Sequence, residues 1–235
     1  MAAQHRVAII SGAERGLGRA IAKKLATNGV IVLPTARDIA LSEDVVGELR
    51  NSGGQAFAYQ LDVTDEESVD RFQIAVEANF GRADILINNA GICIDNIDVP
   101  SRADLQIVKQ TFDTNLFGAW RLCRAFLPLM LRQNYGRIVN ISSAMGQLEA
   151  MGCSSPAYRV SKTALNALTC MLAAEASGHD IQVNAVEPGW MRTDMGGTEA
   201  PRSAEEGAET PVRLALASEG GSSGCFYFDG RLIPW

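Results

Sequence analysis

The chain has 235 residues, 47% of them hydrophobic, which suits one large α/β domain. Its net charge of −6 argues against nucleic acid or an anionic membrane surface as a partner. The five cysteines form no Cys-x-x-Cys pair and there are only two histidines, so we expect neither a disulfide framework nor a metal site. Without an apolar leader at the amino terminus or a membrane-spanning apolar run, the sequence predicts a cytoplasmic protein.

Short apolar runs alternate with longer helical stretches, which is typical of a parallel sheet covered on both faces. The first run, 7–10, is followed by a glycine-rich turn and a helix over Gly16–Thr27. Thr64 and Glu67 have the Thr-x-x-Glu spacing of a capping box, which predicts a helix with Thr64 as its N-cap that ends near 80–81. Longer helices are expected over 102–133 and 157–176. The remaining strands are expected at 30–33, 56–61, 85–87, 137–141, 182–186 and Cys225–Phe228.

These elements predict a single doubly wound, Rossmann-type α/β domain over residues 1–235, with about seven parallel strands and helices on both faces. The stretch 194–210 breaks the rhythm, because it is rich in Gly, Ser, Glu and Pro. A long loop that follows a strand at the ligand-binding end of such a sheet is usually functional. We therefore expect a mobile substrate loop at 194–210.

A glycine-rich turn joins the first strand to the first helix, with glycines at Gly12, Gly16 and Gly18. Glycine allows a tight turn and a close approach to a pyrophosphate, whose charge then lies at the helix N-terminus. The spacing is Gly-x-x-x-Gly-x-Gly and differs from the Gly-x-Gly-x-x-Gly fingerprint. Taken alone, the turn therefore fits either dinucleotide binding or an ordinary glycine-rich connection.

Further motifs follow the later strands in a fixed order. They are Asn88-Asn89-Ala90-Gly91, Asn115 in Asn-Leu-Phe-Gly, Ser142-Ser143, Tyr158-x-x-x-Lys162 and Pro188-Gly189. With these motifs the chain resembles the short-chain dehydrogenase/reductase family over nearly its whole length. Within that family, the segments 35–38, 188–195 and 233–235 look most like the NADPH-dependent carbonyl reductases.

The resemblance implies NADP(H) as the cofactor. Ala36 fills the family's place for an NAD-selecting acid, whereas Arg15 and Arg37 stand where NADP-using relatives carry cations that can clamp a 2′-phosphate. Asp38 is the counter-evidence, because an acid about twenty residues beyond the turn favours NAD. Asp62 has two interpretations, an acceptor for the adenine amine or a turn residue before Thr64. The implied cofactor contacts are Gly12, Arg15, Gly16, Leu17, Gly18, Arg37, Asp62, Val63, Asn89, Ala90, Gly91, Tyr158, Lys162, Pro188, Gly189 and Thr193.

Tyr158 and Lys162 are four residues apart, so on a helix they share one face. A nearby cation favours the phenolate, which predicts a pKa of Tyr158 lowered toward neutrality and a group able to protonate a carbonyl oxygen. A Tyr–Lys pair at this spacing more often lies on the surface of a helix without a catalytic role, so by itself it is weak evidence of catalysis. By resemblance, Ser143 rather than Ser142 stabilises the oxyanion, Lys162 also holds the nicotinamide ribose, and Asn115 fixes a proton-relaying water.

The substrate is predicted to be a small carbonyl compound with apolar or aromatic surroundings. Five apolar side chains lie in the segments after the fifth and sixth strands, and methionine adapts to varied shapes. The alternative is that several of them belong to the core. These side chains are Met145, Leu148, Met151, Trp190 and Met195.

The sequence thus predicts an NADPH-dependent carbonyl reductase of ketones or aldehydes. One alternative is a 3-oxoacyl carrier-protein reductase, which the acidic stretch 199–209 disfavours because the carrier is itself acidic. Another is a non-catalytic NADP-binding sensor, although such proteins typically lose the Tyr or the Lys. The chain lacks the long insertion that keeps some carbonyl reductases monomeric, so a homodimer or homotetramer stays open.

Overall fold

A computed structural model describes residues 5–95 and 99–235. The first four residues, on which the prediction of no apolar leader partly rested, lie outside the described residues. Eight strands form one sheet in the order β3-β2-β1-β4-β5-β6-β7-β8. All pairs are parallel except β7 with β8. The doubly wound fold is confirmed, with eight strands rather than about seven. The strands are β1 Val7–Ser11, β2 Ile31–Ala36, β3 Tyr59–Gln60, β4 Ile85–Asn88, β5 Tyr135–Ile141, β6 Asp180–Glu187, β7 Cys225–Phe228 and β8 Arg231–Ile233.

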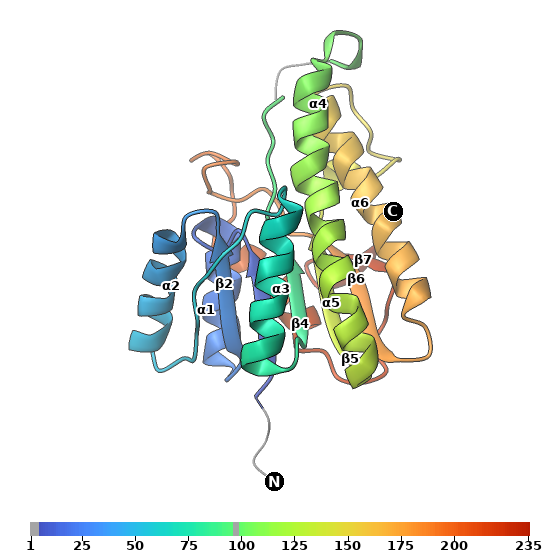
Figure 1. Ribbon diagram of the computed structural model, residues 1–235. Coiled ribbons are helices and arrows are strands. Elements are labelled where there is room, and N and C mark those ends of the chain that lie inside the picture. The colour runs from blue at the N-terminus through green and yellow to red at the C-terminus, as the bar shows by residue number, and fades with distance from the viewer. Residues whose placement is uncertain (1–4, 96–98) are drawn as a thin grey trace.

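Helices cover both faces of the sheet (Figure 1). One face packs against α1 (Gly16–Thr27), α2 (Ile39–Asn51) and α8 (Glu209–Ala215). The other packs against α3 (Glu66–Phe80), α5 (Ala119–Gln133) and α6 (Pro156–Glu175), which lie in front in Figure 1. Strand β1 shows why two layers are needed. Val7 and Ile9 pack in the core beneath α3, α5 and α6, whereas Ala8 and Ile10 pack in the core beneath α1, α2 and α8. Because alternate side chains of a buried strand point to opposite faces, both faces must be covered.

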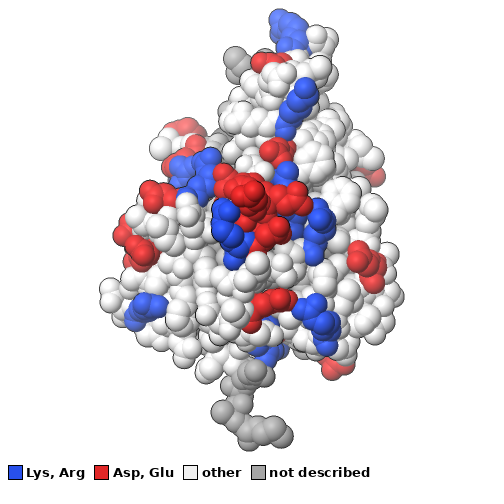
Figure 2. Space-filling model, in the orientation of Figure 1, with Lys and Arg blue, Asp and Glu red and all other residues white. Residues whose placement is uncertain are grey.

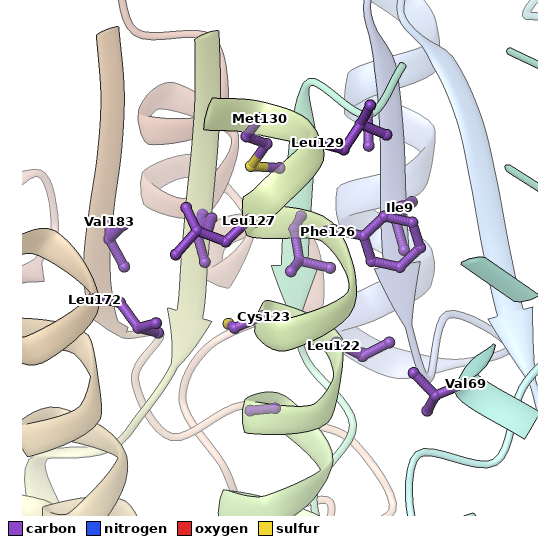
Figure 3. Close-up of a cluster of buried hydrophobic side chains, with 14 of the residues drawn as sticks. Ile9, Val69, Leu122, Cys123, Phe126, Leu127, Leu129, Met130, Leu172 and Val183 are labelled. Atoms are coloured by element: carbon purple, nitrogen blue, oxygen red, sulfur yellow. The ribbon is translucent and has the colours of Figure 1, made fainter. Parts of the chain in front are cut away.

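The core beneath α5 holds much of the second layer together (Figure 3). Leu122, Phe126 and Met130 lie at successive turns of α5, and none of them is exposed. The ring of Phe126 meets that of Phe72 of α3 edge-on, with centroids 5.6 Å apart. Burying a side chain of this size stabilises the fold by about 1.5–3 kcal/mol. The 3.6-residue periodicity of α5 thus places its apolar side chains on the one face of the helix that packs into this core.

Acidic and basic side chains lie side by side in the middle of the face seen in Figure 2. At the start of α3, Glu66 pairs with Arg124 of α5 and Glu67 with Arg71. Acids are favoured at a helix N-terminus by the helix dipole. Exposed pairs of this kind contribute little to stability, so the helices are held mainly by their buried faces.

The predicted capping box at Thr64 is wrong. The N-cap of α3 is Asp65, whose side chain accepts from the amide of Glu67 at 3.0 Å. The amide and the hydroxyl of Thr64 both donate to Asp62 Oδ1, at 2.9 and 2.7 Å. A side chain held by its neighbour in this way is not available to cap the helix.

Two predicted elements are shorter or more divided than expected. The strand over 56–61 reduces to Tyr59–Gln60 with a single bridge at Ala56. Between them, the exposed ring of Phe57 meets that of Phe80 edge-on, with centroids 5.4 Å apart. The helical region over 102–133 consists of η1 (Pro100–Arg102), α4 (Leu105–Phe112), a π-helical segment η2 (Asp113–Gly118), and α5. The antiparallel hairpin that adds β8 was not predicted.

The stretch 194–210 is not a loop throughout. Residues Ala204–Gly207 form α7, and α8 begins at Glu209. Ser203 and Glu206 form a true capping box around α7, and Arg202 makes a parallel bridge to Met191. Those contacts anchor the segment to the rest of the fold. The Gly-, Ser-, Glu- and Pro-rich composition gave no sign of them. Its mobility stays a prediction. Within the described part of the chain, no helix has the length and apolar character to cross a membrane.

Candidate active site

The predicted site residues lie at the carboxyl ends of neighbouring strands. The chain leaves β1 toward β2 on one side, while β4 joins β1 on the other, so the strand order reverses between β1 and β4. Ligands bind in the crevice at such a switch point. The glycine turn follows β1, the Asn89 motif follows β4, and Ser143 follows β5. Because Ile141 of β5 pairs with Val186 of β6, the segments that leave these two strands begin side by side.

The glycine turn is a cradle that side chains would fill. Gly12 and Gly16 have φ of +62° and +53°, a left-handed conformation that favours glycine. An added Cβ at Gly18 would lie 2.4 Å from the carbonyl oxygen of Gly12. Helix α1 therefore begins in direct contact with the turn, with its first amides directed at the crevice. This geometry fits a dinucleotide pyrophosphate.

The motif after β4 braces this turn. Asn89 Nδ2 donates to the carbonyl oxygens of Ser11 and Gly12, at 2.9 and 2.7 Å. In return, Ser11 Oγ accepts from the amides of Asn89 and Ala90, at 3.0 and 3.1 Å. These hydrogen bonds join two motifs whose residues are 77 to 79 positions apart in the sequence. The side chain of Asn89 shapes the cradle, while Ala90 and Gly91 continue along the crevice.

The two predicted phosphate-binding arginines differ in their surroundings. Arg15 is 68% exposed and forms an ion pair with Asp194. Arg37 is exposed just after β2. Asp38, the counter-evidence for NADP, accepts from the amide of Ala40 at 3.0 Å and caps α2. Its carboxylate therefore has a structural role that does not require a ribose.

The other predicted cofactor residues frame the same crevice. Leu17 and Val63 are buried, and Val63 lies against Gly118 of η2. Pro188 and Gly189 follow β6, with Gly189 at φ +86°. Thr193 lies directly over the glycine turn, 3.3 Å from where a Cβ of Gly16 would stand. Both hydrogen bonds from Thr64 go to Oδ1 of Asp62, so the second carboxylate oxygen, Oδ2, takes no part in them.

Helix α6 carries Tyr158 and Lys162 into the site. Ser155 precedes the helix in a left-handed conformation, and the buried Asp95 accepts from the amide of Ala157 at 2.6 Å. The first turn of α6 is thereby capped by a loop that follows β4. Lys162 Nζ lies 5.6 Å from the centroid of the Tyr158 ring and donates to the carbonyl oxygen of Ile141 at 2.7 Å. The two side chains face each other as predicted.

The electrostatics of this pair differ from the expectation. Burial raises the pKa of Tyr158, and a hydrogen bond with Ser143 only partly opposes that rise. The lowering that the sequence predicted is therefore wrong, because removal from water disfavours the phenolate. Burial likewise lowers the pKa of Lys162, from 10.5 to about 8. The site holds a protonated phenol beside an ammonium that can release its proton near neutral pH.

The structure distinguishes the two adjacent serines. Ser142 is buried and donates to Asn166 Oδ1 at 2.5 Å. Ser143 is half-buried, hydrogen-bonds with Tyr158, and accepts from the amide of Met145 at 3.1 Å to begin η3 (Ala144–Gly146). The second serine of the pair is therefore the one that faces the tyrosine.

Asn115 lies in the π-helical segment η2, and such bulges are frequent at functional sites. Its Oδ1 accepts from the amide of Ile92 at 2.8 Å, and its Nδ2 donates to the Ile92 carbonyl at 2.9 Å and to Ser161 Oγ at 3.0 Å. A Cβ on Gly91 would lie within 3.5 Å of both Asn115 and Lys162. The asparagine and the lysine thus meet at Gly91, and the water-relay role of Asn115 stays a prediction.

Sequence reasoning missed Glu187, the last residue of β6. Its Oε2 accepts from the amide of Ala144, its Oε1 accepts from the amide of Gly189 at 2.8 Å, and Ser143 hydrogen-bonds to the same carboxylate. Burial raises its pKa, and the two backbone amides oppose that rise. The signal was an acid at the end of a largely buried strand, directly before Pro188.

Apolar side chains border the catalytic end of the sheet. Leu148 and Met151, in the segment after β5, are exposed, as are Trp190 and Met195 after β6. The indole nitrogen of Trp190 donates to the carbonyl of Gly196 at 2.8 Å and fixes this segment. Four exposed apolar side chains beside a polar site indicate a surface for an apolar ligand. Across residues 5–95 and 99–235, no three His, Cys, Asp or Glu side chains are grouped to hold a metal.

Comparison with known proteins places this geometry in context. A model of the short chain dehydrogenase family matches residues 6–204. The chain is 34% identical to carbonyl reductase (NADPH) 1 of Macaca fascicularis, over 98% of each protein. It is also 34% identical to (+)-neomenthol dehydrogenase of Arabidopsis thaliana, over 94% of this chain and 95% of that protein.

Solved structures show the same fold. A metagenomic short-chain oxidoreductase in complex with NADP superimposes with a TM-score of 0.80 at 31% identity, over 92% of this chain and 93% of the other. Salutaridine reductase from Papaver somniferum superimposes with a TM-score of 0.83 at 27% identity, over 95% and 99%.

Proposed function

This chain belongs to the short chain dehydrogenase family, and on that premise we propose that it is an NADPH-dependent carbonyl reductase of ketones or aldehydes. The observation that carries the proposal is the convergence of Ser143, Tyr158 and Lys162 beside a glycine cradle at the switch point of the sheet. A protonated phenol next to a dinucleotide cradle is the arrangement that carbonyl reduction requires.

The residues present fit NADPH. The cradle of Gly12, Gly16 and Gly18 leaves room for a pyrophosphate at the start of α1. Arg15 and Arg37 would hold the 2′-phosphate, since guanidinium groups bind phosphate through paired hydrogen bonds. Two relatives agree, because one is named as an NADPH enzyme and one was solved with NADP. When bound, NADPH would supply the hydride.

Tyr158 acts as the general acid. Because burial raises its pKa, the phenol is protonated at neutral pH and can donate its proton to the substrate's carbonyl oxygen. Ser143 would hydrogen-bond the same oxygen and stabilise its developing charge. The phenolate left behind is disfavoured in its buried surroundings, so it recovers a proton readily. Lys162, with a pKa of about 8, lies on the path by which that proton returns.

The surroundings favour apolar or aromatic carbonyl compounds. Leu148 and Met151 follow β5 while Trp190 and Met195 follow β6, and these strands are neighbours. Burial of an apolar substrate between them would gain about 25 cal/mol for each Å² removed from water. The acids of 199–209 are exposed, which supports the expectation that an acidic acyl carrier would not dock there. A homodimer or homotetramer stays a prediction.

The test is NADPH consumption across a panel of aryl ketones, aliphatic ketones, aldehydes and a 3-oxoacyl thioester, with Tyr158→Phe as the control. We expect turnover of apolar ketones or aldehydes by the wild type and background rates in the variant. Turnover of the thioester alone would favour the acyl reductase. Tight binding of NADPH with no oxidation by any carbonyl would favour the sensor.

A further inference from the structure

Tyr158 lies in the first turn of α6, the part of a helix that frays most easily. The helix begins at Pro156, so Tyr158 is its third residue. The first amides of a helix have no intrahelical acceptor, and they need a cap to hold this turn in place. The residue before the helix, Ser155, has a left-handed φ of +53°, and its side chain forms no capping hydrogen bond. The turn that carries Tyr158 therefore depends on an acceptor from elsewhere.

That acceptor is Asp95, which lies in the loop after β4. Its Oδ2 accepts from the amide of Ala157 at 2.6 Å, across 62 positions of the sequence. Asp95 is only 3% exposed, so this hydrogen bond is shielded from water. The helix dipole favours an acidic group at a helix N-terminus, and the first turn of α6 contains no acidic residue of its own. Asp95 thus supplies from a distant loop the cap that the helix lacks.

The loop that carries Asp95 is itself fixed beside the reacting centre. Asn115 accepts from the amide of Ile92 at 2.8 Å and donates to the carbonyl oxygen of Ile92 at 2.9 Å. Asn115 also donates to Ser161 Oγ at 3.0 Å, and that hydroxyl donates to the carbonyl oxygen of Tyr158 at 2.7 Å. Tyr158 is therefore held on both sides. Asp95 binds the amide of the residue before it, and Ser161 binds its own carbonyl oxygen.

We propose that Asp95 is a positioning residue, which fixes the first turn of α6 and so holds the hydroxyl of Tyr158 where a substrate's carbonyl oxygen receives its proton. The inference rests on the proposed function, because it concerns the placement of the proton donor. Helix α6 continues for 20 residues to Glu175, and Lys162 lies beyond its first turn. Loss of the cap should therefore free the turn that carries Tyr158 and leave Lys162 in place.

The test separates this role from ordinary helix capping. Asp95→Ala removes the acceptor, whereas Asp95→Asn keeps an oxygen that can accept from the same amide. The other carboxylate oxygen, Oδ1, has no hydrogen-bond partner among the described residues, so the amide nitrogen of the Asn variant would displace no existing bond. The matched control is Asp65→Ala, which removes the acceptor that caps α3. That helix carries no predicted site residue.

Residue-resolved hydrogen exchange reports on the first turn without depending on turnover. In the wild type, the amide of Ala157 should exchange as slowly as amides in the middle of α6, a result that does not require any variant to fold. In Asp95→Ala this exchange should become about tenfold faster, which is the usual effect of losing a helix cap. Asp95→Asn should stay close to the wild type, and Asp65→Ala should speed exchange only at the start of α3.

Steady-state assays with an apolar ketone then relate the turn to the reaction. We expect kcat of Asp95→Ala to fall by about tenfold or more, because a small misplacement of a reacting group is costly, while KM for NADPH is retained. Asp95→Asn should recover most of the lost kcat, and Asp65→Ala should keep the wild-type value.

Four results would overturn the inference: fast exchange of the Ala157 amide in the wild type, unchanged exchange in a folded Asp95→Ala variant, a wild-type kcat in that variant, or an Asp95→Asn variant as impaired as Asp95→Ala. If the exchange results are as expected but the wild type reduces no carbonyl, the proposed function fails while the hold of Asp95 on the first turn stands.

Discussion

The glycine turn after β1 and the reacting centre at the ends of β5, β6 and α6 are built in opposite ways. The turn is made almost wholly of backbone: glycines in left-handed conformations, amides at the start of α1, and carbonyls held by Asn89. The reacting centre is made of side chains whose ionisation is shifted by burial, namely Tyr158, Lys162 and Glu187. The first region is therefore sensitive to added atoms, and the second to altered charge.

This difference separates binding from chemistry. A change that fills the cradle should weaken cofactor binding and stability without touching the proton donor. A change of one polar atom in the reacting centre should stop turnover while the cofactor still binds. The predictions below test that division, in order of decreasing effect.

Tyr158→Phe should have the largest effect. The variant removes one hydroxyl from a packed ring, so the fold and NADPH binding are retained while the general acid is lost. We expect kcat for carbonyl reduction to fall by about 10²–10⁴-fold, measured as NADPH oxidation. A variant that keeps a tenth or more of the wild-type kcat would remove Tyr158 from the mechanism.

Gly18→Ala should damage the cradle. Its Cβ would lie 2.4 Å from the Gly12 carbonyl oxygen and 2.6 Å from Asn89 Nδ2, so the turn must shift. We expect the free energy of unfolding to fall by about 1–3 kcal/mol in denaturant titrations, and NADPH affinity to fall with it. The matched control is Gly47→Ala in α2, where nothing lies within 4 Å. There, removing a helix glycine should raise stability by about 0.5–1 kcal/mol. Equal effects at both positions would contradict the close approach.

Arg37→Ala should reduce the preference for NADPH over NADH. Loss of one exposed, charged hydrogen-bond donor to the 2′-phosphate is worth about 1.5 kcal/mol, or roughly tenfold in the ratio of the two kcat/KM values. The NADH value itself should hardly change. Arg124→Ala, which removes an exposed arginine paired with Glu66, is the control. If the ratio is the same in both variants, Arg37 takes no part in cofactor selection.

The burial of Lys162 should appear in the pH dependence of stability. Its pKa in the folded protein is about 8, against 10.5 ordinarily, so between these values the unfolded chain binds more protons than the folded one. Stability must then rise with pH in that window, by about 1 kcal/mol between about pH 8 and pH 9, and level off above the unfolded pKa. Denaturant titrations of the wild type and Lys162→Met should show this rise only in the wild type. The same slope in both would mean that Lys162 titrates normally.

The sequence predicted the cradle better than the ends of the elements around it. Glycine spacing at a strand–helix junction has few structural solutions, so Gly12, Gly16 and Gly18 indicated the turn, whereas its use for a cofactor followed only from the later motifs and the family resemblance. Thr64 and Asp65 are adjacent residues that can both cap a helix, and only the three-dimensional position of Asp62 decides between them. Sequence patterns do not report such local competition.

The structure brings Ser143, Tyr158 and Lys162 together as the sequence predicted, but their electrostatics differ from the prediction. The spacing of Tyr158 and Lys162 placed them on one face, but the depth of burial that raises the phenol's pKa follows from packing across the whole sheet. Glu187 was missed for the same reason, because its partners lie 43 residues earlier and two residues later in the sequence. Likewise, the base of the 194–210 stretch depends on the pairing of Arg202 with Met191, which its composition conceals.

The most direct test of hydride transfer governed by Tyr158 uses NADPH carrying deuterium at the transferable position of the nicotinamide. With an apolar aryl ketone as substrate, mass spectrometry of the product alcohol reports whether that deuterium reaches the former carbonyl carbon. We expect one deuterium per alcohol formed by the wild type, and alcohol only at background in Tyr158→Phe. Alcohol without deuterium, or labelled alcohol formed as quickly by the variant, would contradict the proposed function.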